Sequence, residues 1–301
     1  MKLIDAFDEF LLYLQVEKNY SLCTIDSYHH DFQCLLNFLN ENNRSKILDD
    51  LSPILIRRFI QDQVTRQHVK PRTIQRRISS LKSFSRFTMK VQFIEKDFTA
   101  GIEAPKHDKL LPVYMTLIEL KMLFKYLESD NRPSSLRNEL IFKLFATTGM
   151  RRQELVDLTW QQIDFHQQTI RIFGKGKKER LLPLHPIVIP LFKKYHDSLL
   201  LNQTHSTEPI FLNSRKEKFN PRGLHVLFKR SLEAAGLPPT RFSLHHLRHT
   251  FATLLLQEAK EKVDLRTLQE LLGHESLATT SIYTHVDFEL KKQAIHSFVL
   301  S

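Results

Sequence analysis

Residues 243–256, "SLHHLRHTFATLLL", place three histidines and an arginine immediately before an apolar run. Ser243 can cap the N-terminus of a helix that runs to about residue 257. His245 and Arg248 are three residues apart, so one helical surface carries both side chains. The apolar side of the same helix consists of Leu247, Phe251, Leu254 and Leu255. The stretch therefore predicts a helix that packs on a core and presents an imidazole and a guanidinium together.

The histidines of this stretch suit a phosphate better than a metal ion. His245, His246 and His249 stand at i, i+1 and i+4, where their rings converge poorly, and the glutamate of an H-E-x-x-H zinc motif is missing. Arg248 would also repel a cation. A guanidinium that binds through two N–H groups, beside a titratable imidazole, fits a phosphate. We therefore predict no metal site and no cofactor.

The composition favours a nucleic-acid partner. The 301-residue chain carries a formal net charge of +11 and a pI of about 9.6. This charge favours a polyanion, with nucleic acid ahead of an anionic membrane surface. A basic but otherwise ordinary enzyme is the alternative. Only 7 glycines are present, which disfavours a glycine-rich phosphate loop.

The expected location is the cytoplasm, at the nucleoid. Cys23 and Cys34 are the only cysteines, too few for a disulfide framework and without a C-x-x-C zinc pair. Residues 1–15 mix acidic with apolar side chains, which predicts an amphipathic helix and not a signal peptide. No run of about 18 apolar residues occurs, so we expect no membrane partner.

The chain divides into two domains joined by a linker. Residues 1–98 repeat apolar side chains at helical spacing and predict a helical domain, in which Ser52 and the proline after it form a strong helix start. Residues 99–112 contain two prolines and no periodicity, which indicates the linker. Residues 113–301 form the second domain, which opens with a predicted capping box at Thr116.

Residues 65–90 predict a strongly basic helix. The segment holds eight lysines and arginines and no acidic residue. At about 100° per residue, most of the basic side chains share one arc with small polar ones, and the apolar side chains gather opposite. Small residues allow close approach to a DNA groove, and long cations reach phosphates. The predicted DNA contacts are Arg72, Arg76, Ser79, Lys82, Arg86 and Lys90. A solvated helix face is the alternative.

The segment "TGMRRQEL", residues 148–155, predicts a helix that ends at Gly149 and a second one that begins near Arg151. An arginine at a helix N-terminus stands where anions bind. Glu154, three residues further on, can orient the side chain of Arg151. For this segment alone, an ordinary surface arginine is the alternative.

The segment "QTIRIFGKGKKERLLPL" predicts a β-hairpin. Residues 169–173 and 179–184 have the composition of two strands, and "GKGKK" forms the turn between them. Lys175 lies at the tip, where a hairpin can insert it into a DNA groove. A soluble turn without function is the alternative.

The stretch "DLRTLQELLGHESLATTSIYTHV" predicts two more helices. Asp264 can cap a helix that Gly273 ends, and Ser276 can cap a second helix that carries Tyr283. His274 stands at the corner between them. A lone tyrosine on a helix is usually a packing residue. Here it follows two arginines, a lysine and two histidines that can all address one phosphate.

Taken in order, "TGMRRQEL", "GKGKKER", "HHLRH" and "LLGHESLATTSIYTH" resemble the motifs of the tyrosine recombinases, also called the phage integrase family, and in particular its XerC/XerD type. The resemblance covers nearly the whole chain, because "SLCTIDSYHHDFQCLLNFL" resembles the first helices of the family's core-binding domain and "KHDKLLPVYMTLIEL" its interdomain linker. It implies a mainly α fold. A helical, SAM-like core-binding domain would occupy residues 1–98. A mixed α+β catalytic domain with a small antiparallel sheet would occupy residues 113–301, and the two would form a C-shaped clamp on DNA.

The resemblance also assigns roles by position. The matching catalytic residues are Arg151, Lys175, His245, Arg248, His274 and the nucleophile Tyr283, with Glu154 in a supporting role. The family's R-x-x-E-L register selects Arg151 over its neighbour. Leu244 stands where Xer-type relatives usually have proline. This departure leaves the subfamily assignment undecided but does not affect the predicted chemistry.

These residue types suit the cleavage of a phosphodiester. Arg151 and Arg248 can clamp the equatorial oxygens of the transition state, with a histidine donating a further hydrogen bond. Tyr283 would attack phosphorus and form a 3′-phosphotyrosyl link. Its phenol, with a usual pKa of about 10, must lose a proton, for which His245 is the best-placed base. Lys175 would protonate the leaving 5′-oxygen.

The expected function is site-specific DNA recombination, two strands at a time through a Holliday junction. The partners implied by the resemblance are double-stranded DNA with inverted-repeat sites and accessory proteins. Lys177 and Lys178 would also contact this DNA. The protein would act as a homo- or hetero-tetramer on two duplexes. A C-terminal helix at 287–301 would pass to a neighbouring protomer or dock on its own domain. Dimer resolution and mobile-element integration are both open roles. The competing functions are a type IB-like topoisomerase and a catalytically silent DNA-binding protein.

Overall fold

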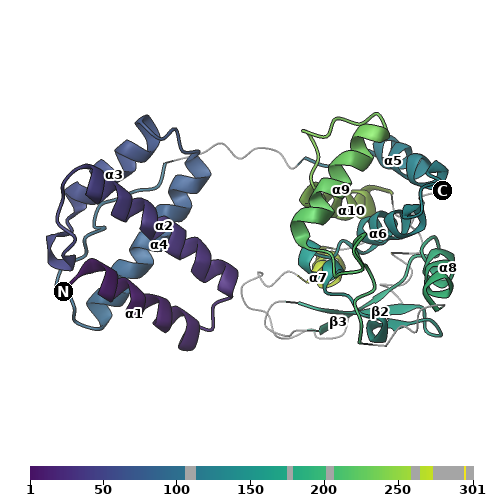
Figure 1. The fold of residues 1–301 in the computed structure, drawn as a ribbon, viewed down its shortest axis with the longest axis horizontal. Helices are drawn as coiled ribbons and strands as arrows, with labels where there is room; N and C mark the ends of the chain where they lie inside the picture. The colour runs from purple at the N-terminus through teal and green to yellow at the C-terminus, as the bar shows by residue number, and fades with distance from the viewer. Residues whose placement is uncertain (106–112, 175–178, 201–206, 259–264, 274–294, 296–301) are drawn as a thin grey trace. The chain divides into compact units, whose positions relative to one another are not determined.

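The computed structural model separates the chain into two compact units, Met1–Leu110 and Leu111–Ser301. Figure 1 draws both units as ribbons. The residues that the structure describes are 1–105, 113–174, 179–200, 207–258, 265–273 and 295. Within them, no helix is long and apolar enough to cross a membrane.

The N-terminal unit is helical. Its elements are α1 (Leu3–Val16), α2 (Leu22–Glu41), the short η1 (Leu48–Asp50), α3 (Pro53–Thr65) and α4 (Pro71–Lys90). The expected helix start at residue 52 is confirmed, because Ser52 Oγ accepts a hydrogen bond from Leu55 N at 3.3 Å and a proline follows it. Phenylalanines from three helices fill the core: Phe7 stacks on Phe32 with ring centroids 3.6 Å apart, and Phe84 meets both rings edge-on.

The C-terminal unit, called the catalytic unit after the domain that the sequence predicts there, combines helices with a three-stranded antiparallel sheet. Its elements are α5 (Leu117–Ser129), α6 (Ser135–Thr148), α7 (Arg152–Val156), η2 (Trp160–Gln162), β1 (Ile163–Asp164), β2 (Thr169–Phe173), β3 (Glu179–Pro183), α8 (Ile189–Leu200), α9 (Pro221–Ala234), α10 (Leu244–Glu258) and α11 (Leu265–Leu272). The strand order is β1-β2-β3, and β2 pairs with β3 from Phe173–Glu179 to Thr169–Pro183. Figure 1 shows β2 and β3 side by side. The predicted hairpin and the mainly α fold with a small antiparallel sheet are confirmed.

Helix α6 forms the centre of the catalytic unit. Almost every side chain from residue 140 to residue 148 is buried, and the helix packs against α5, α8 and α10. It ends where predicted, at Gly149, whose φ of 56° is the left-handed conformation that favours glycine. A Cβ at this position would also collide with Phe251 of α10 and Leu272 of α11. The absence of a side chain therefore allows the ends of α6 and α11 to approach α10 closely.

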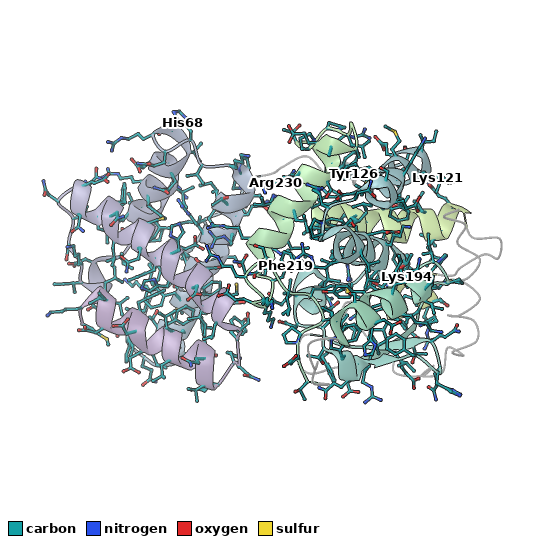
Figure 2. All side chains as sticks on the ribbon, turned by 45° about the vertical axis from the view of Figure 1, so that its right-hand side comes forward. His68, Lys121, Tyr126, Lys194, Phe219 and Arg230 are labelled. Carbon is teal, nitrogen blue, oxygen red and sulfur yellow. The ribbon has the colours of Figure 1, made fainter. Side chains whose placement is uncertain are left out.

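A helix cap and a cation–π contact stabilise the helices α5 and α6 of the catalytic unit. The capping box at Thr116 is confirmed: its hydroxyl accepts from Glu119 N at 3.2 Å, and Glu119 Oε2 accepts from Thr116 N at 2.8 Å. Glu119 Oε1 also accepts from Arg241 Nη1 at 2.7 Å. The Arg137 guanidinium of α6 lies 4.9 Å from the centroid of the Phe219 ring (labelled in Figure 2).

Candidate active site

A cavity of about 570 Å³ lies where α6, α7, α9 and α10 meet. Its lining residues are Phe145, Met150, Arg151, Arg152, Gln153, His225, Ser243, Leu244, His245 and Arg248. Three of the residues singled out in the sequence, Arg151, His245 and Arg248, therefore share one cavity although almost a hundred residues separate the first from the other two. Two cations and an imidazole around a cavity form a site for an anion.

Arg151 is held at the N-terminus of α7. The predicted pair with Glu154 is present: Arg151 Nη1 lies 2.8 Å from Glu154 Oε1, and Arg151 N donates to Glu154 Oε2 at 2.7 Å. Its Nη2 donates to the carbonyl of Gly273 at 2.7 Å. Glu154 and the Gly273 carbonyl thus hold the guanidinium in place. Because the side chain is 39% exposed, the guanidinium remains accessible from the cavity.

Glu154 is buried, and a second arginine completes its environment. Arg180 on β3 donates from Nη1 to Glu154 Oε1 at 3.0 Å and from Nη2 to Glu154 Oε2 at 2.6 Å. Burial alone would raise the pKa of the Glu154 carboxyl, but the hydrogen bonds and charges of Arg180, and then those of Arg151, hold it below its usual range. The carboxylate is therefore ionised and accepts four hydrogen bonds. The sequence reading missed Arg180.

Arg248 is almost fully buried beneath the cavity. It donates from Nη1 to the carbonyl of Gly149 and from Nη2 to the carbonyl of Leu272 at 2.7 Å. Burial and the neighbouring charge of Arg151 lower the pKa of Arg248 to about 10. The guanidinium still carries its charge at neutral pH. Arg151, Arg180 and Arg248 thus place three positive charges near the single ionised carboxylate of Glu154.

The histidines of α10 point in different directions. Ser243 caps the helix as predicted, accepting from His246 N at 3.3 Å. The exposed His245 lies at the cavity, and its ring centroid is 4.4 Å from that of His249. The Nδ1 of His246 instead faces the carbonyl of Arg241 at 3.0 Å. Burial and the charges of His246 and Arg248 lower the pKa of His249.

The C-terminus of α11 is bound by three arginines. Three successive backbone carbonyls each accept a hydrogen bond from a different arginine. The carbonyl of Leu271 accepts from Arg180 Nε at 3.1 Å, that of Leu272 accepts from Arg248, and that of Gly273 accepts from Arg151. Cations at a helix C-terminus stabilise it. This arrangement fixes the chain up to the residue before His274. The predicted site residues Lys175, Lys177, Lys178, His274 and Tyr283 lie outside the described residues.

Sequence reasoning also missed residues that line or support the cavity. His225 on α9 and Arg152 on α7 both line it. Burial, with the charges of Lys229 and Arg152, lowers the pKa of His225. Lys229 donates to the carbonyls of Pro239 and Phe242 and so anchors the loop that leads into α10. These residues follow no motif in the sequence, because their roles arise only when α9 packs beside α7.

The basic helix α4 presents part of the predicted DNA-contact set to solvent. Arg72, Ser79, Arg86 and Lys90 are exposed, and Lys82 is half-buried. The expected apolar side is buried, namely Ile74, Ile78, Leu81 and Phe84. Arg76 differs from the others, because its Nη1 lies 2.6 Å from Oδ2 of the buried Asp31. Its charge is thus partly neutralised within the unit.

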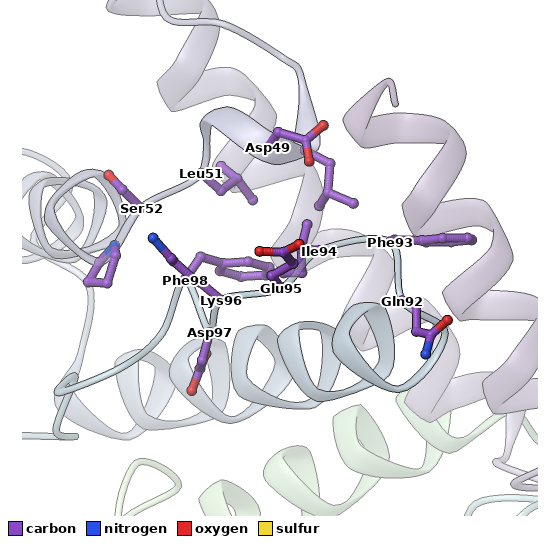
Figure 3. A pocket seen from close by; sticks show the side chains of 12 residues that line it. Asp49, Leu51, Ser52, Gln92, Phe93, Ile94, Glu95, Lys96, Asp97 and Phe98 are labelled. Atoms are coloured by element: carbon purple, nitrogen blue, oxygen red, sulfur yellow. The ribbon is translucent and has the colours of Figure 1, made fainter.

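A second cavity, of about 490 Å³, lies in the N-terminal unit between the start of α3 and residues 92–98 (Figure 3). Its acidic side chains include Asp97, whose Oδ1 accepts from Ser85 Oγ at 2.6 Å and from Thr99 N at 2.7 Å. Burial opposes ionisation, but these hydrogen bonds lower the pKa of the Asp97 carboxyl. Asp97 thus stabilises the loop after α4.

Comparisons with known proteins match both units of the chain. The "Phage integrase family" pattern matches residues 114–289, and the "Phage integrase, N-terminal SAM-like domain" pattern matches residues 7–92. The tyrosine recombinase XerC of Oceanobacillus iheyensis is 36% identical over 95% of this chain and 93% of its own length. The tyrosine recombinase XerD of Staphylococcus aureus is 33% identical over 93% of each chain. A crystal structure of the XerH site-specific recombinase bound to difH substrate superposes with a TM-score of 0.70 at 25% identity, over 92% of this chain and 80% of that one.

Proposed function

The chain belongs to the phage integrase family and is a site-specific tyrosine recombinase, and on that premise we propose that it cuts and rejoins DNA through a 3′-phosphotyrosyl intermediate on Tyr283. The observation that carries the proposal is the shared cavity of Arg151, His245 and Arg248. A topoisomerase or a silent DNA-binding protein is not favoured, because the relatives that match nearly the whole chain are XerC and XerD recombinases.

The two arginines bind the phosphate that is cleaved. A guanidinium has five N–H donors, and Arg151 and Arg248 each use only some of them in the carbonyl and carboxylate bonds described above. The remaining donors can bind the nonbridging oxygens, on which charge builds up as the phosphorus becomes pentavalent. Because Glu154 and the backbone carbonyls already fix both guanidiniums, little reorganisation is needed at the moment of reaction.

Proton transfers complete the step. His245, exposed at the cavity, takes the phenolic proton while the Tyr283 oxygen forms a bond to phosphorus. The bond from phosphorus to the 5′-oxygen breaks, and Lys175 gives that oxygen a proton. His274 donates a hydrogen bond to a phosphate oxygen. A 5′-hydroxyl of another strand then attacks the phosphotyrosine and regenerates the phenol, so no external energy source is consumed.

The assembly that we propose is a homo- or hetero-tetramer on two DNA duplexes with inverted-repeat sites, which exchanges two strands at a time through a Holliday junction. Exposed cations of α4 and the hairpin lysines 177 and 178 would bind the phosphate backbone. Exchange of the segment 287–301 between protomers requires one rearrangement: Ile295 is fully buried in the core of its own catalytic unit, so it must leave that core.

The biological role that we propose is Xer-like, acting on DNA in the cytoplasm at the nucleoid. The support is the similarity to XerC and XerD relatives and to a XerH structure described as bound to difH substrate. Chromosome-dimer resolution and mobile-element recombination both fit this class of reaction. Accessory proteins would decide the direction of exchange.

Plasmid assays test the function. A binding site is first selected from a random library of inverted repeats with the full chain. A supercoiled plasmid with two such sites should then yield recombinant circles, and a plasmid with one site should not be relaxed. Tyr283→Phe should bind the same sites and yield no product. Relaxation of the single-site plasmid without recombination would instead identify a topoisomerase.

A further inference from the structure

We propose that Arg180 is a positioning residue for the cleavage reaction, which holds Arg151 in place through Glu154. The inference rests on the proposed function and assigns a role to a residue that touches none of the reacting atoms. Arg180 lies on β3 and is only 11% exposed, so its charge is largely removed from water and needs partners within the fold.

Arg180 fixes the position of the Glu154 carboxylate by its geometry. Arg180 binds Glu154 with both Nη atoms, each to a different carboxylate oxygen, at 3.0 and 2.6 Å. This bidentate arrangement fixes the plane of the carboxylate as well as its position. Glu154 Oε1, set in this way, is also the atom that binds Arg151 Nη1 at 2.8 Å. Arg180 therefore sets the direction of the Arg151 guanidinium through Glu154, together with the Gly273 carbonyl that accepts from Arg151 Nη2.

Arg180 also keeps the Glu154 carboxyl ionised. A carboxyl as buried as Glu154 would favour its neutral form, and Arg180 is the largest influence that keeps it ionised. Without Arg180, Arg151 would be the main remaining partner, and a carboxyl that gains a proton accepts hydrogen bonds less strongly. Arg151 is 39% exposed, so a weakened hold would let its guanidinium move toward solvent.

The same side chain also contacts the backbone of the segment before His274. Arg180 Nε donates to the carbonyl of Leu271 at 3.1 Å. Its Nη1 and Cδ would lie only 3.0 and 3.3 Å from a Cβ at Gly273, which has a φ of 63°. A glycine is therefore needed where Arg180 packs on the backbone. One arginine thus connects β3, α7 and the end of α11.

A buried ion pair that serves only folding is the competing explanation, and kinetics separate the two. Formation of the covalent adduct is measured in single turnover, with saturating protein and a nicked suicide substrate. Arg180→Gln should slow adduct formation by about 100-fold, the scale on which loss of a preorganised donor acts. Arg171→Gln, on the same hairpin and 60% exposed, is the matched control and should react at the wild-type rate.

A substrate with sulfur in place of the bridging 5′-oxygen shows which group Arg180 serves. Sulfur leaves without a proton, so this substrate restores a variant that has lost the general acid, Lys175→Ala. If Arg180 acts through Arg151, Arg180→Gln remains about 100-fold slow on it. Restoration by sulfur would show that Arg180 serves the hairpin lysine and would overturn the proposal.

Folding is followed in every variant by the fluorescence of Trp160, the single tryptophan, which lies in the catalytic unit. Should Arg180→Gln not fold, Arg180→Lys decides: it keeps the charge but loses the two-pronged bond, and it should be slow on both substrates. If a folded Arg180 variant forms the adduct as fast as Arg171→Gln does, the inference about Arg180 is overturned but the proposed function is not. An absence of adduct with the wild-type protein would instead count against the proposed function.

Discussion

Asp31 in the N-terminal unit and Glu154 in the catalytic unit are both buried carboxylates beside two arginines, yet their pKa values move in opposite directions. Burial raises the pKa of Asp31, and the charges of Arg76 and Arg77 only partly oppose the rise. Burial acts on Glu154 in the same sense, but there its two arginines outweigh it and the pKa is lowered. The number of neighbouring cations therefore does not decide the outcome.

Hydrogen-bond completeness explains the difference. Both oxygens of Glu154 accept two bonds each from Arg151 and Arg180. Asp31 Oδ2 accepts from Arg76, but Oδ1 and Arg77 Nε stand 3.5 Å apart and form no hydrogen bond within the described part of the chain. A fully bonded carboxylate can orient a catalytic arginine, whereas a partly bonded one mainly fills a helix interface.

The largest expected effect is that of Glu154→Gln. The change leaves Arg180 buried without its counter-charge, so the free energy of unfolding of the catalytic unit should fall by about 3 kcal/mol. Trp160 fluorescence in a denaturant titration reports this transition. Asp31→Asn, in the other unit, should leave the Trp160 transition unchanged. Equal transitions for Glu154→Gln and the wild type would contradict the comparison.

Asp31→Asn should have a smaller effect in its own unit. Because the carboxyl is incompletely bonded and its ionised form is disfavoured, the neutral amide should cost only about 1 kcal/mol. Hydrogen exchange of the α2 and α4 amides in the full chain measures it. A loss as large as that of Glu154→Gln would show that Asp31 is bonded as completely as Glu154.

The two carboxylates should also respond to acid with opposite signs. The folded-state pKa of Glu154 is lowered, so its contribution to stability is present above the unfolded pKa of about 4.3 and is lost as the pH falls through the folded value. For Asp31 the folded-state pKa is raised. Its contribution to the free energy of unfolding therefore becomes more favourable as the pH falls toward the unfolded pKa of about 3.9. The stability difference from the wild type, followed between about pH 6 and 3 for Glu154→Gln and Asp31→Asn, checks both slopes. Slopes of the same sign would refute this assignment.

The smallest expected effect concerns DNA binding by α4. Arg86 is exposed, so Arg86→Ala should lower the slope of log K against log salt by about 1. Arg76→Ala should change the slope less, since Asp31 already neutralises part of the Arg76 charge. Equal slopes for the two variants would show that Arg76 leaves Asp31 to bind phosphate.

Local signals in the sequence predicted the elements well. The caps at Ser52, Thr116 and Ser243, the helix end at Gly149 and the hairpin all depend on neighbouring residues, and the structure contains them. The motif order also led to Arg151, His245 and Arg248, which share the cavity. Arg180 could not be assigned, because its partners are 26 and 91 residues away along the chain. For the same reason, helical periodicity placed Arg76 on an open face and could not show the pairing with Asp31 from α2.

Mapping the covalent link between protein and DNA shows directly whether Tyr283 is the nucleophile. The wild-type protein is trapped on a suicide substrate with its selected site and digested with protease and nuclease, and the peptide that retains a nucleotide is sequenced by mass spectrometry. We expect a 3′-phosphate remnant on Tyr283 and no labelled peptide from Tyr283→Phe. A remnant on any other residue, or attachment through a 5′-phosphate, would contradict it.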